Sequence, residues 1–296
     1  MADGYLADRN EVADCTITSN VSWLTSSPLD AMKTTPLIDV AESTSIGTVE
    51  SPVVIEMAWT TARYINYAGL QHTNLRQESY RRCEVFSDTE KTDLLYTSVN
   101  AAGKDKRVVP GIYDPATLRP GSSNWLRGGL DARDFRLYPT NIHEVIPLCR
   151  ARVIRWTLWG AAYEPDDSDA TSYRIGLAWA SDGQTFARHV GSTGEGTRSN
   201  DELIETPGGS VWVEPGTAKR FATIDRAVTD KDLRDALFDM AHRAGRNKPL
   251  IWLPNTTAAD DCFRYGGLFR RADDHQHKYM APFYTNGTIE LEEWTE

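Results

Sequence analysis

Residues 146–159 read IPLCRARVIRWTLW, and a similar stretch, SPVVIEMAWTTARYINY, occupies residues 51–67. Arg150, Arg152 and the apolar or aromatic residues that follow them alternate with a period of two. A strand that buries one face against a second sheet has this period, because successive side chains point to opposite faces. The two stretches therefore predict a pair of packed antiparallel sheets, which is more typical of a binding or assembly module than of an enzyme.

Short strand-like runs separated by turn residues continue along the chain, as in a β-sandwich rather than a helical or α/β fold. The stretch at 51–67 is expected to begin two strands, at 53–57 and 62–68. A long surface loop is expected at 101–127, and a linker or long loop at 180–215. Other strands are expected at 14–18, 80–86, 94–98, 149–160, 173–179, 210–213, 250–253, 263–269 and 288–294.

One helix stands out in the sequence, at residues 229–244, and is expected to be the main helix. Thr229 is a suitable N-cap with an acidic residue three positions later, and Gly245 follows as a C-cap. Between these caps, Leu233, Leu237 and Met240 recur on one face. The segment is therefore predicted to be an amphipathic helix packed on a sheet.

The composition between residues 180 and 215, rich in glycine, serine and acids, marks a domain boundary. We predict an all-β protein with an N-terminal arm at residues 1–11, a jelly-roll β-sandwich at residues 12–182 and a smaller β-rich domain at residues 183–296. The smaller domain carries the one amphipathic helix.

Charge and hydropathy exclude several kinds of partner. The net charge is −10, with 32 lysines and arginines among 42 acidic residues. Phosphate binding needs a basic stripe, so no stable nucleic-acid binding is expected. No apolar run reaches about 18 residues, so no membrane partner is expected. No signal peptide precedes the acidic start, and we expect production in the cytoplasm.

The four cysteines are far apart and share no CxxC spacing: Cys15, Cys83, Cys149 and Cys262. In a chain of this length without a leader, buried free thiols are the favoured interpretation. Two disulfides, or a zinc or iron–sulfur site assembled from distant cysteines, stay open as alternatives.

Two histidines, His275 and His277, form the most metal-like cluster, because positions i and i+2 of a strand share a face. No third ligand is spaced to match, so a polar turn is favoured and no metal or other cofactor is expected. No Gly-x-Ser-x-Gly elbow is present, and the acid pairs at 166–167 and 260–261 lie in polar turns. The sequence thus predicts a protein that is not an enzyme.

The tryptophans suggest carbohydrate binding, since sugars stack on exposed aromatic faces. Trp125 lies in the proline-rich loop beside Asn124 and Arg127, and these three residues are the candidates for a carbohydrate contact. The tryptophans in strand-like runs are expected in the core instead: Trp59, Trp156, Trp159, Trp179 and Trp252.

The first half of the chain has a recognisable order of segments: NVSWL at 20–24, then 51–59, 62–70, 74–75 and 80–87, and RVIRW at 152–156. This order resembles a discoidin-like, galactose-binding jelly roll, in the variant found in structural proteins of tailed bacteriophages. The second half, with the helix at 229–244 followed by PLIWLP at 249–254, resembles a phage distal-tail or tail-tip protein.

The resemblance implies a virion protein, a subunit of a homo-oligomeric ring (hexamer or trimer) at the distal end of a phage tail. Such a ring joins the tail tube to the baseplate hub or fibres and is assembled in the host cytoplasm. DNA must pass its lumen without sticking, so acidic loops are expected to line it, with Glu195, Asp201, Glu202 and Glu205 as candidates. Two other classes stay open: a carbohydrate-binding module for host-surface attachment, and a hydrolase of cell-wall or capsular glycan.

Overall fold

The structure is a computed structural model of the 296-residue chain. The residues that it describes are 3–35, 37–109, 111, 129–130, 135, 138–164, 168–187, 194–199, 202–205, 211–214, 218–229, 231–273, 276–281 and 284–295.

Two compact units make up the chain. The first, which we name the sandwich unit, consists of Arg9–Gly183 and Asn255–Arg264. The second unit consists of Met1–Asp8, Gln184–Pro254 and Tyr265–Thr295. The sequence therefore starts in the second unit, forms most of the sandwich unit, and returns at Gln184.

An eight-stranded sheet forms the sandwich unit, in the order β3-β11-β4-β8-β5-β6, with β2 beside β4 and β7 beside β5. Two short 3-10 helices and most of helix α3 (Ala259–Tyr265) accompany it, and β9 and β10 pair separately. The elements are η1 (Glu11–Asp14), β2 (Thr16–Ser19), η2 (Leu29–Lys33), β3 (Ala41–Glu42), β4 (Val53–Thr73), β5 (Tyr80–Phe86), β6 (Leu94–Thr97), β7 (Lys106–Arg107), β8 (Thr140–Trp159), β9 (Ala162–Tyr163), β10 (Asp169–Ala170) and β11 (Arg174–Ser181).

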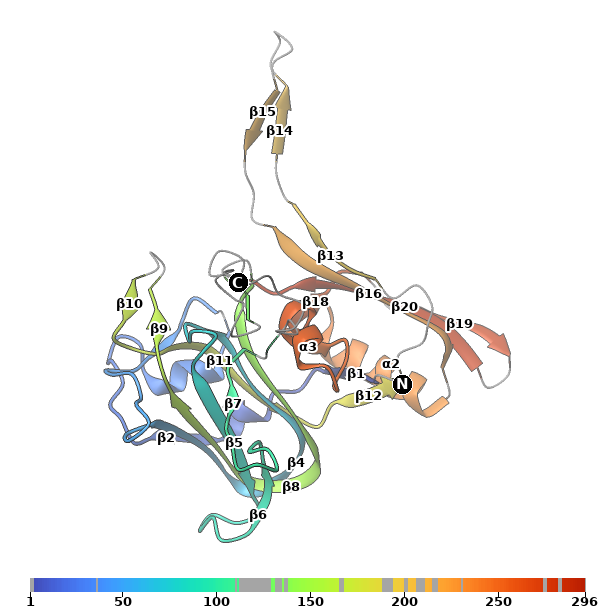
Figure 1. The fold of residues 1–296 in the computed structure, drawn as a ribbon. Helices are drawn as coiled ribbons and strands as arrows, with labels where there is room; N and C mark the ends of the chain where they lie inside the picture. The colour runs from blue at the N-terminus through green and yellow to red at the C-terminus, as the bar shows by residue number, and fades with distance from the viewer. Residues whose placement is uncertain are drawn as a thin grey trace. The chain divides into compact units, whose positions relative to one another are not determined.

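The two longest strands, β4 and β8, pair antiparallel along most of their length and curve together (Figure 1). Strand β2 pairs with the first half of β4, and β11 pairs with its second half. Both long strands therefore contribute to the two layers of the sandwich. The register shifts between Ala58 and Arg63, where Thr60 and Thr61 are exposed at the bend.

The core of the sandwich unit follows the period-two pattern. Along β4, Val53, Ile55 and Met57 are buried while the residues between them are half-buried. On β8, Trp156 is 0% exposed, which confirms its predicted burial. Trp59 and Trp179 are also buried, as is Trp252 in the second unit, whereas Trp159 is half-buried and stacks on Tyr80 with ring centroids 5.7 Å apart.

The second unit is built on another eight-stranded sheet, in the order β12-β1-β17-β18-β20-β16-β13, with β19 beside β20. Strands β14 and β15 form a separate hairpin that extends beyond β13 and β16 (Figure 1). Helix α2 (Lys231–Ala244) buries Leu237 and Met240 in a cluster with apolar side chains of the sheet. The strands are β1 (Asp3–Ala7), β12 (Gln184–Ala187), β13 (Gly194–Arg198), β14 (Glu202–Glu205), β15 (Val211–Glu214), β16 (Lys219–Thr229), β17 (Leu250–Leu253), β18 (Gly267–Arg271), β19 (Gln276–Ala281) and β20 (Tyr284–Glu293).

The expected fold class is confirmed: the protein is all-β, with a sandwich and a further β-rich unit that carries an amphipathic helix. That helix begins at Lys231, because Thr229 still belongs to β16. A second helix, α3, was not expected from the sequence. Residues 263–265 were predicted to begin a strand, but they form the end of α3. Asp260 and Asp261 favour this helix, because they lie in its first turn, at the positive end of the helix dipole.

Three expectations about chain organisation also differ from the structure. The two strands expected at 53–57 and 62–68 are one bent strand, β4. The segment at 180–215, expected to be a linker or long loop, contains paired strands, because ladders are formed by backbone groups that glycine and polar residues also have. Residues 3–7, expected in an arm, form β1 between β12 and β17.

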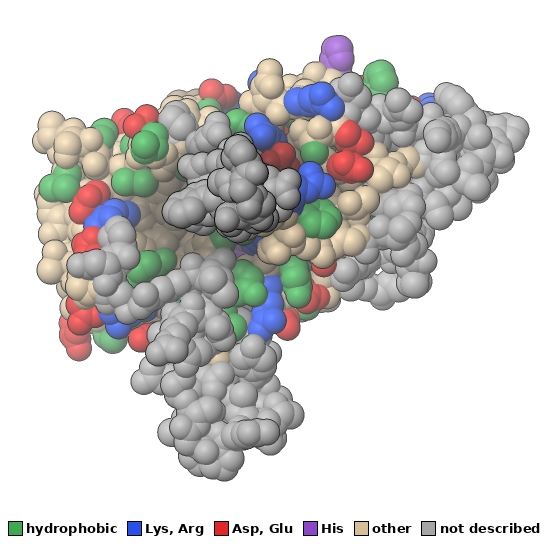
Figure 2. Space-filling model, turned by 90° about the horizontal axis from the view of Figure 1, so that it is seen from above, with side chains coloured by type: hydrophobic (Ala, Val, Ile, Leu, Met, Phe, Trp, Pro, Cys, Tyr) green, Lys and Arg blue, Asp and Glu red, His purple; other side chains and the backbone are tan. Residues whose placement is uncertain are grey.

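Acidic and basic side chains are interspersed on the face of the molecule shown in Figure 2. In the part of the chain that the structure describes, no helix has the length and apolar character needed to cross a membrane. All four cysteines are free thiols, and only Cys149 is partly exposed.

Candidate functional site

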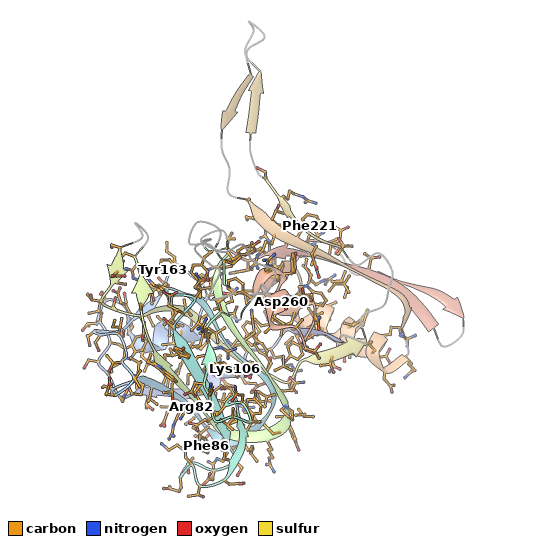
Figure 3. The ribbon with its side chains drawn as sticks, in the orientation of Figure 1. Arg82, Phe86, Lys106, Tyr163, Phe221 and Asp260 are labelled. Carbon is orange, nitrogen blue, oxygen red and sulfur yellow. The ribbon has the colours of Figure 1, made fainter. Side chains whose placement is uncertain are left out.

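A cavity of about 390 Å³ lies in the sandwich unit, between the strands and helix α3. Lys106 on β7 and Asp260 on α3, labelled in Figure 3, mark two of the elements that bound it. The exposed residues of the lining show where it opens: Lys106, Arg107, Gly111 and Ala259. The rest of the lining is Arg81, Tyr96, Val108, Asn141, His143, Glu144, Val145, Thr256, Cys262 and Phe263.

Glu144 is the centre of the polar lining. It lies on β8 between Ile142 and Ile146, which share its face and are buried in the core. Its side chain is only 3% exposed. A carboxylate therefore occupies a position where the strand pattern calls for an apolar residue, and it needs partners to remain charged.

Three side chains from neighbouring strands supply those partners. The Arg81 guanidinium lies 2.5 Å from Oε2 of Glu144, and its other terminal nitrogen donates to the carbonyl oxygen of His143 at 3.0 Å. The Tyr96 hydroxyl and the Lys106 ammonium both donate to Oε1. Strand pairing sets this geometry, because Arg81 and Lys106 are directly opposite in the β5–β7 register.

These contacts change the ionisation of both Glu144 and Tyr96. Burial by itself raises the pKa of Glu144, but the charges of Arg81 and Lys106 and the hydrogen bonds from Lys106 and Tyr96 outweigh it, so the pKa lies below its ordinary value. Burial and the adjacent Glu144 charge raise the pKa of the Tyr96 phenol. At neutral pH the cavity thus contains a carboxylate anion beside a phenol that keeps its proton.

Apolar and neutral groups complete the lining. The Phe263 ring is stacked on the Phe135 ring and tilted against the Tyr138 ring. The ring centroids are 6.2 Å and 5.8 Å apart, respectively. The Cys262 thiol donates to the carbonyl oxygen of Asn255, and burial raises its pKa to about 12. Cys262 therefore stays protonated and does not offer a nucleophile.

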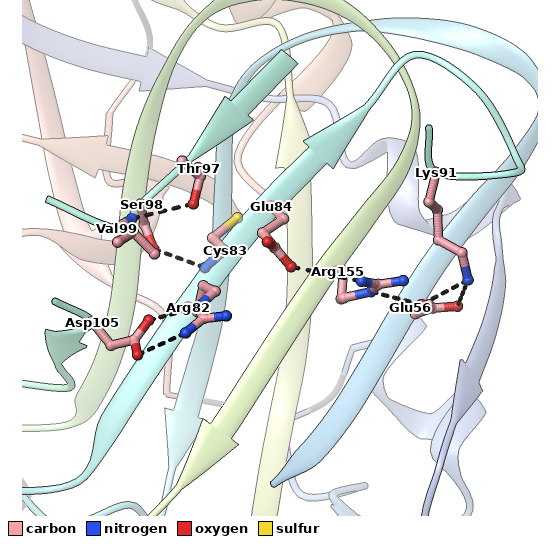
Figure 4. A network of polar contacts seen from close by, with 10 residues as sticks. All are labelled: Glu56, Arg82, Cys83, Glu84, Lys91, Thr97, Ser98, Val99, Asp105 and Arg155. Atoms are coloured by element: carbon pink, nitrogen blue, oxygen red, sulfur yellow. Dashed lines mark hydrogen bonds and ion pairs between the residues drawn. The ribbon is translucent and has the colours of Figure 1, made fainter. Parts of the chain in front are cut away.

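A second polar network lies on the outer face of the same sheet (Figure 4). Arg155 on β8 lies between Glu56 on β4 and Glu84 on β5, directly opposite both in register. Its Nε is 2.8 Å from Glu56, which also binds Lys91 at 3.0 Å. Arg82, labelled in Figures 3 and 4, forms a bidentate pair with Asp105 at 2.6 and 2.8 Å.

This outer network contributes Glu56, Arg82, Glu84 and Arg155 to the lining of a second groove of about 460 Å³, which Thr18, Ser19 and Asn20 also line. Its carboxylates and cations are matched in number: Glu56, Glu84 and Asp105 face Arg82, Lys91 and Arg155. Each charge is thus already compensated by a neighbour in a solvent-accessible position. The cavity around Glu144 is the better candidate for a binding site, because its central carboxylate is only 3% exposed and lies behind an opening lined by Lys106.

Most of the site residues expected from the sequence lie outside the described part of the chain. This is so for Trp125, Asn124 and Arg127, for His275, and for Asp201. They remain predictions.

The other expected site residues have described backbones. His277 lies on β19, and Glu202 and Glu205 lie at the two ends of β14. Glu195 is half-buried on β13, which belongs to a different sheet from β14. Their role in lining a lumen stays a prediction.

Sequence reasoning missed the cavity residues. The available signal was a charged residue at an apolar position of a strand: Glu144 between Ile142 and Ile146, and Arg81 two residues before Cys83 in β5. Their partnership was not visible, because 63 residues separate them.

No protein-family model matches the sequence, and no curated protein does. Among similar solved structures, a fucose binding module of Streptococcus pneumoniae has 8% identity and a TM-score of 0.36, over 58% of this chain and 94% of that one. The lectin domain of lectinolysin, complexed with Lewis B antigen, has 5% identity and a TM-score of 0.35, over 58% and 96%. CBM32-3 from a family 31 glycoside hydrolase of Clostridium perfringens has 12% identity and a TM-score of 0.34, over 58% and 94%. At these values the likeness assigns no ligand to this chain.

Proposed function

We propose that the sandwich unit is a carbohydrate-binding module and that the cavity around Glu144 receives the sugar. The observation that carries this proposal is the convergence of donors, an acceptor and aromatic rings in one cavity of about 390 Å³. Small-molecule sites have volumes of about 300–1,000 Å³ and a few well-placed polar groups in a mainly apolar lining.

The chemistry of the lining suits a sugar. Hydroxyl groups both donate and accept hydrogen bonds, and the lining has donors in Lys106 and Asn141 and an acceptor in Glu144. Tyr96 and Phe263 add aromatic surface, on which the apolar face of a sugar ring can pack. Glu144 is held by three partners before any ligand arrives, which reduces the entropy lost on binding.

A glycan array probed with the purified full-length chain tests the proposal. Ala259 is exposed at the start of α3 and lines the cavity, so Ala259→Trp should obstruct the opening and abolish the array signal. Ala102→Trp is the matched control, because Ala102 is exposed in a turn outside the lining. An array signal that survives Ala259→Trp would place the ligand elsewhere, and no signal from the unmodified chain would contradict the function itself.

The assembly role expected from the sequence, as a subunit of a ring at the distal end of a phage tail, stays a prediction. It is compatible with carbohydrate binding, since a tail-tip subunit can also contact the host surface. Electron microscopy of the purified protein tests it separately. Closed rings would support the assembly role, and dispersed monomers at high concentration would count against it.

A further inference from the structure

The charge of the cavity lining differs from the charge of the chain as a whole. The chain carries a net charge of −10. Among the described lining residues, Glu144 is the one carboxylate, and it faces the cations of Arg81 and Lys106, with Arg107 at the opening. Among these described residues, the cations therefore outnumber the carboxylates.

Lys106 is the cation best placed to meet a ligand. Its side chain is 43% exposed, whereas Arg81 is 9% exposed and is committed to Glu144 and to the His143 carbonyl. Glu144 needs one positive charge for neutralisation, and Arg81 supplies it at 2.5 Å. The Lys106 ammonium has three donors and uses one on Glu144, so it can bind a second acceptor without leaving the first.

We propose that the cavity selects sugars that carry an anionic group, with the anion placed beside Lys106. This inference rests on the proposed carbohydrate-binding function and narrows its ligand class. An anion there compensates the excess cation in a partly desolvated site, where the attraction is stronger than in bulk water. The hydroxyls of the same sugar meet the neutral donors deeper in the lining.

Isothermal titration calorimetry with matched monosaccharides tests the selection. The probes are galactose and galacturonate, with galactose 6-sulfate to distinguish a carboxylate ligand from a sulfate ligand. At low ionic strength we expect at least one of the two anionic sugars to bind about fivefold or more tightly than galactose. The preference should shrink as salt is added, because an accessible charge pair is screened.

Two variants assign the preference to Lys106. Lys106→Gln keeps a donor for Glu144 but removes the charge, so the ratio of anionic to neutral affinity should fall to about one. Lys106→Arg keeps the charge and should retain the preference. Lys91→Gln is the matched control, because Lys91 is also a partly exposed lysine paired with a glutamate, but on the outer face; it should leave the ratio unchanged.

The outcomes separate the two proposals. Equal binding of galactose and both anionic sugars would overturn the selection for anions and leave carbohydrate binding standing. A preference that survives Lys106→Gln would overturn the assignment to this residue. If no sugar binds on the array or in the calorimeter, the proposed carbohydrate binding is contradicted, and so is the inference that rests on it.

Discussion

Strand β5 places two adjacent arginines in opposite surroundings. Arg81 points into the sandwich unit and pairs with Glu144, whose side chain is 3% exposed. Arg82 points to the outer face and is 36% exposed; it pairs with Asp105, in the network that also includes Glu56, whose side chain is 22% exposed. One step along a strand thus separates a buried ion pair from a solvated one, because successive side chains alternate in direction.

The two carboxylates show how burial changes the consequences of an ion pair. In each case burial raises the pKa, and hydrogen-bonded cations lower it by more. Water solvates Glu56 when a partner leaves, whereas Glu144 has no comparable alternative. The inner network should therefore tolerate far less change than the outer one.

The largest loss of stability is expected at Trp156. This residue follows Arg155 in β8, and its side chain points into the core. Trp156→Ala should lower the free energy of unfolding by about 3–5 kcal/mol, the usual cost of removing a large aromatic from a packed core. Among the described residues, the indole N–H of Trp156 has no hydrogen-bond partner, so Trp156→Phe should cost clearly less. Urea unfolding of both variants measures the difference. Equal losses for both would show that the N–H is satisfied.

Removing the buried carboxylate should come next. Glu144→Leu leaves Arg81 charged and buried, which should cost about 3 kcal/mol or more. The double variant Glu144→Leu with Arg81→Met removes both charges and should be more stable than Glu144→Leu alone, since no unpaired ion remains. A double variant as unstable as the sum of its single changes would show that Arg81 contributes independently of Glu144.

The pH dependence of stability should also report on the inner network. The pKa of Glu144 in the folded state lies below its ordinary value of 4.5. The unfolded chain therefore takes up this proton first, so the stabilisation is complete above that value and is lost as the pH falls through the folded-state pKa. Denaturant unfolding of the unmodified chain and of Glu144→Gln should be measured over a pH series. The difference between their free energies of unfolding should become smaller as the solution is made acidic. A difference that does not change with pH would mean that Glu144 is not the titrating group.

The smallest effect is expected on the outer face. Glu56→Gln should change the free energy of unfolding by only about 0.2–1 kcal/mol, because Lys91 and Arg155 can be solvated when the charge is removed. The difference should diminish further at high salt. A loss as large as that of Glu144→Leu would show that the outer network is not in contact with solvent and would remove the contrast between the faces.

The local patterns in the sequence predicted the class of structure. The period-two alternation around residues 150–156 indicated a half-buried strand, and Trp156 is indeed buried. The capped, 3.6-residue periodicity after Thr229 indicated the helix that became α2. These signals are reliable because burial of one face acts on residues that are close in the chain.

Long-range pairing, by contrast, was decided only by the tertiary structure. The cavity exists because β5, β7 and β8 lie side by side, which brings Arg81 and Lys106 to Glu144 from 63 and 38 positions away. From the sequence, each of these residues can be recognised as a charged residue within a strand. The sequence does not show which residues of distant strands lie opposite each other. Register depends on how whole faces pack and how β4 and β8 bend together, so the partner of a buried charge is a property of the folded sheet.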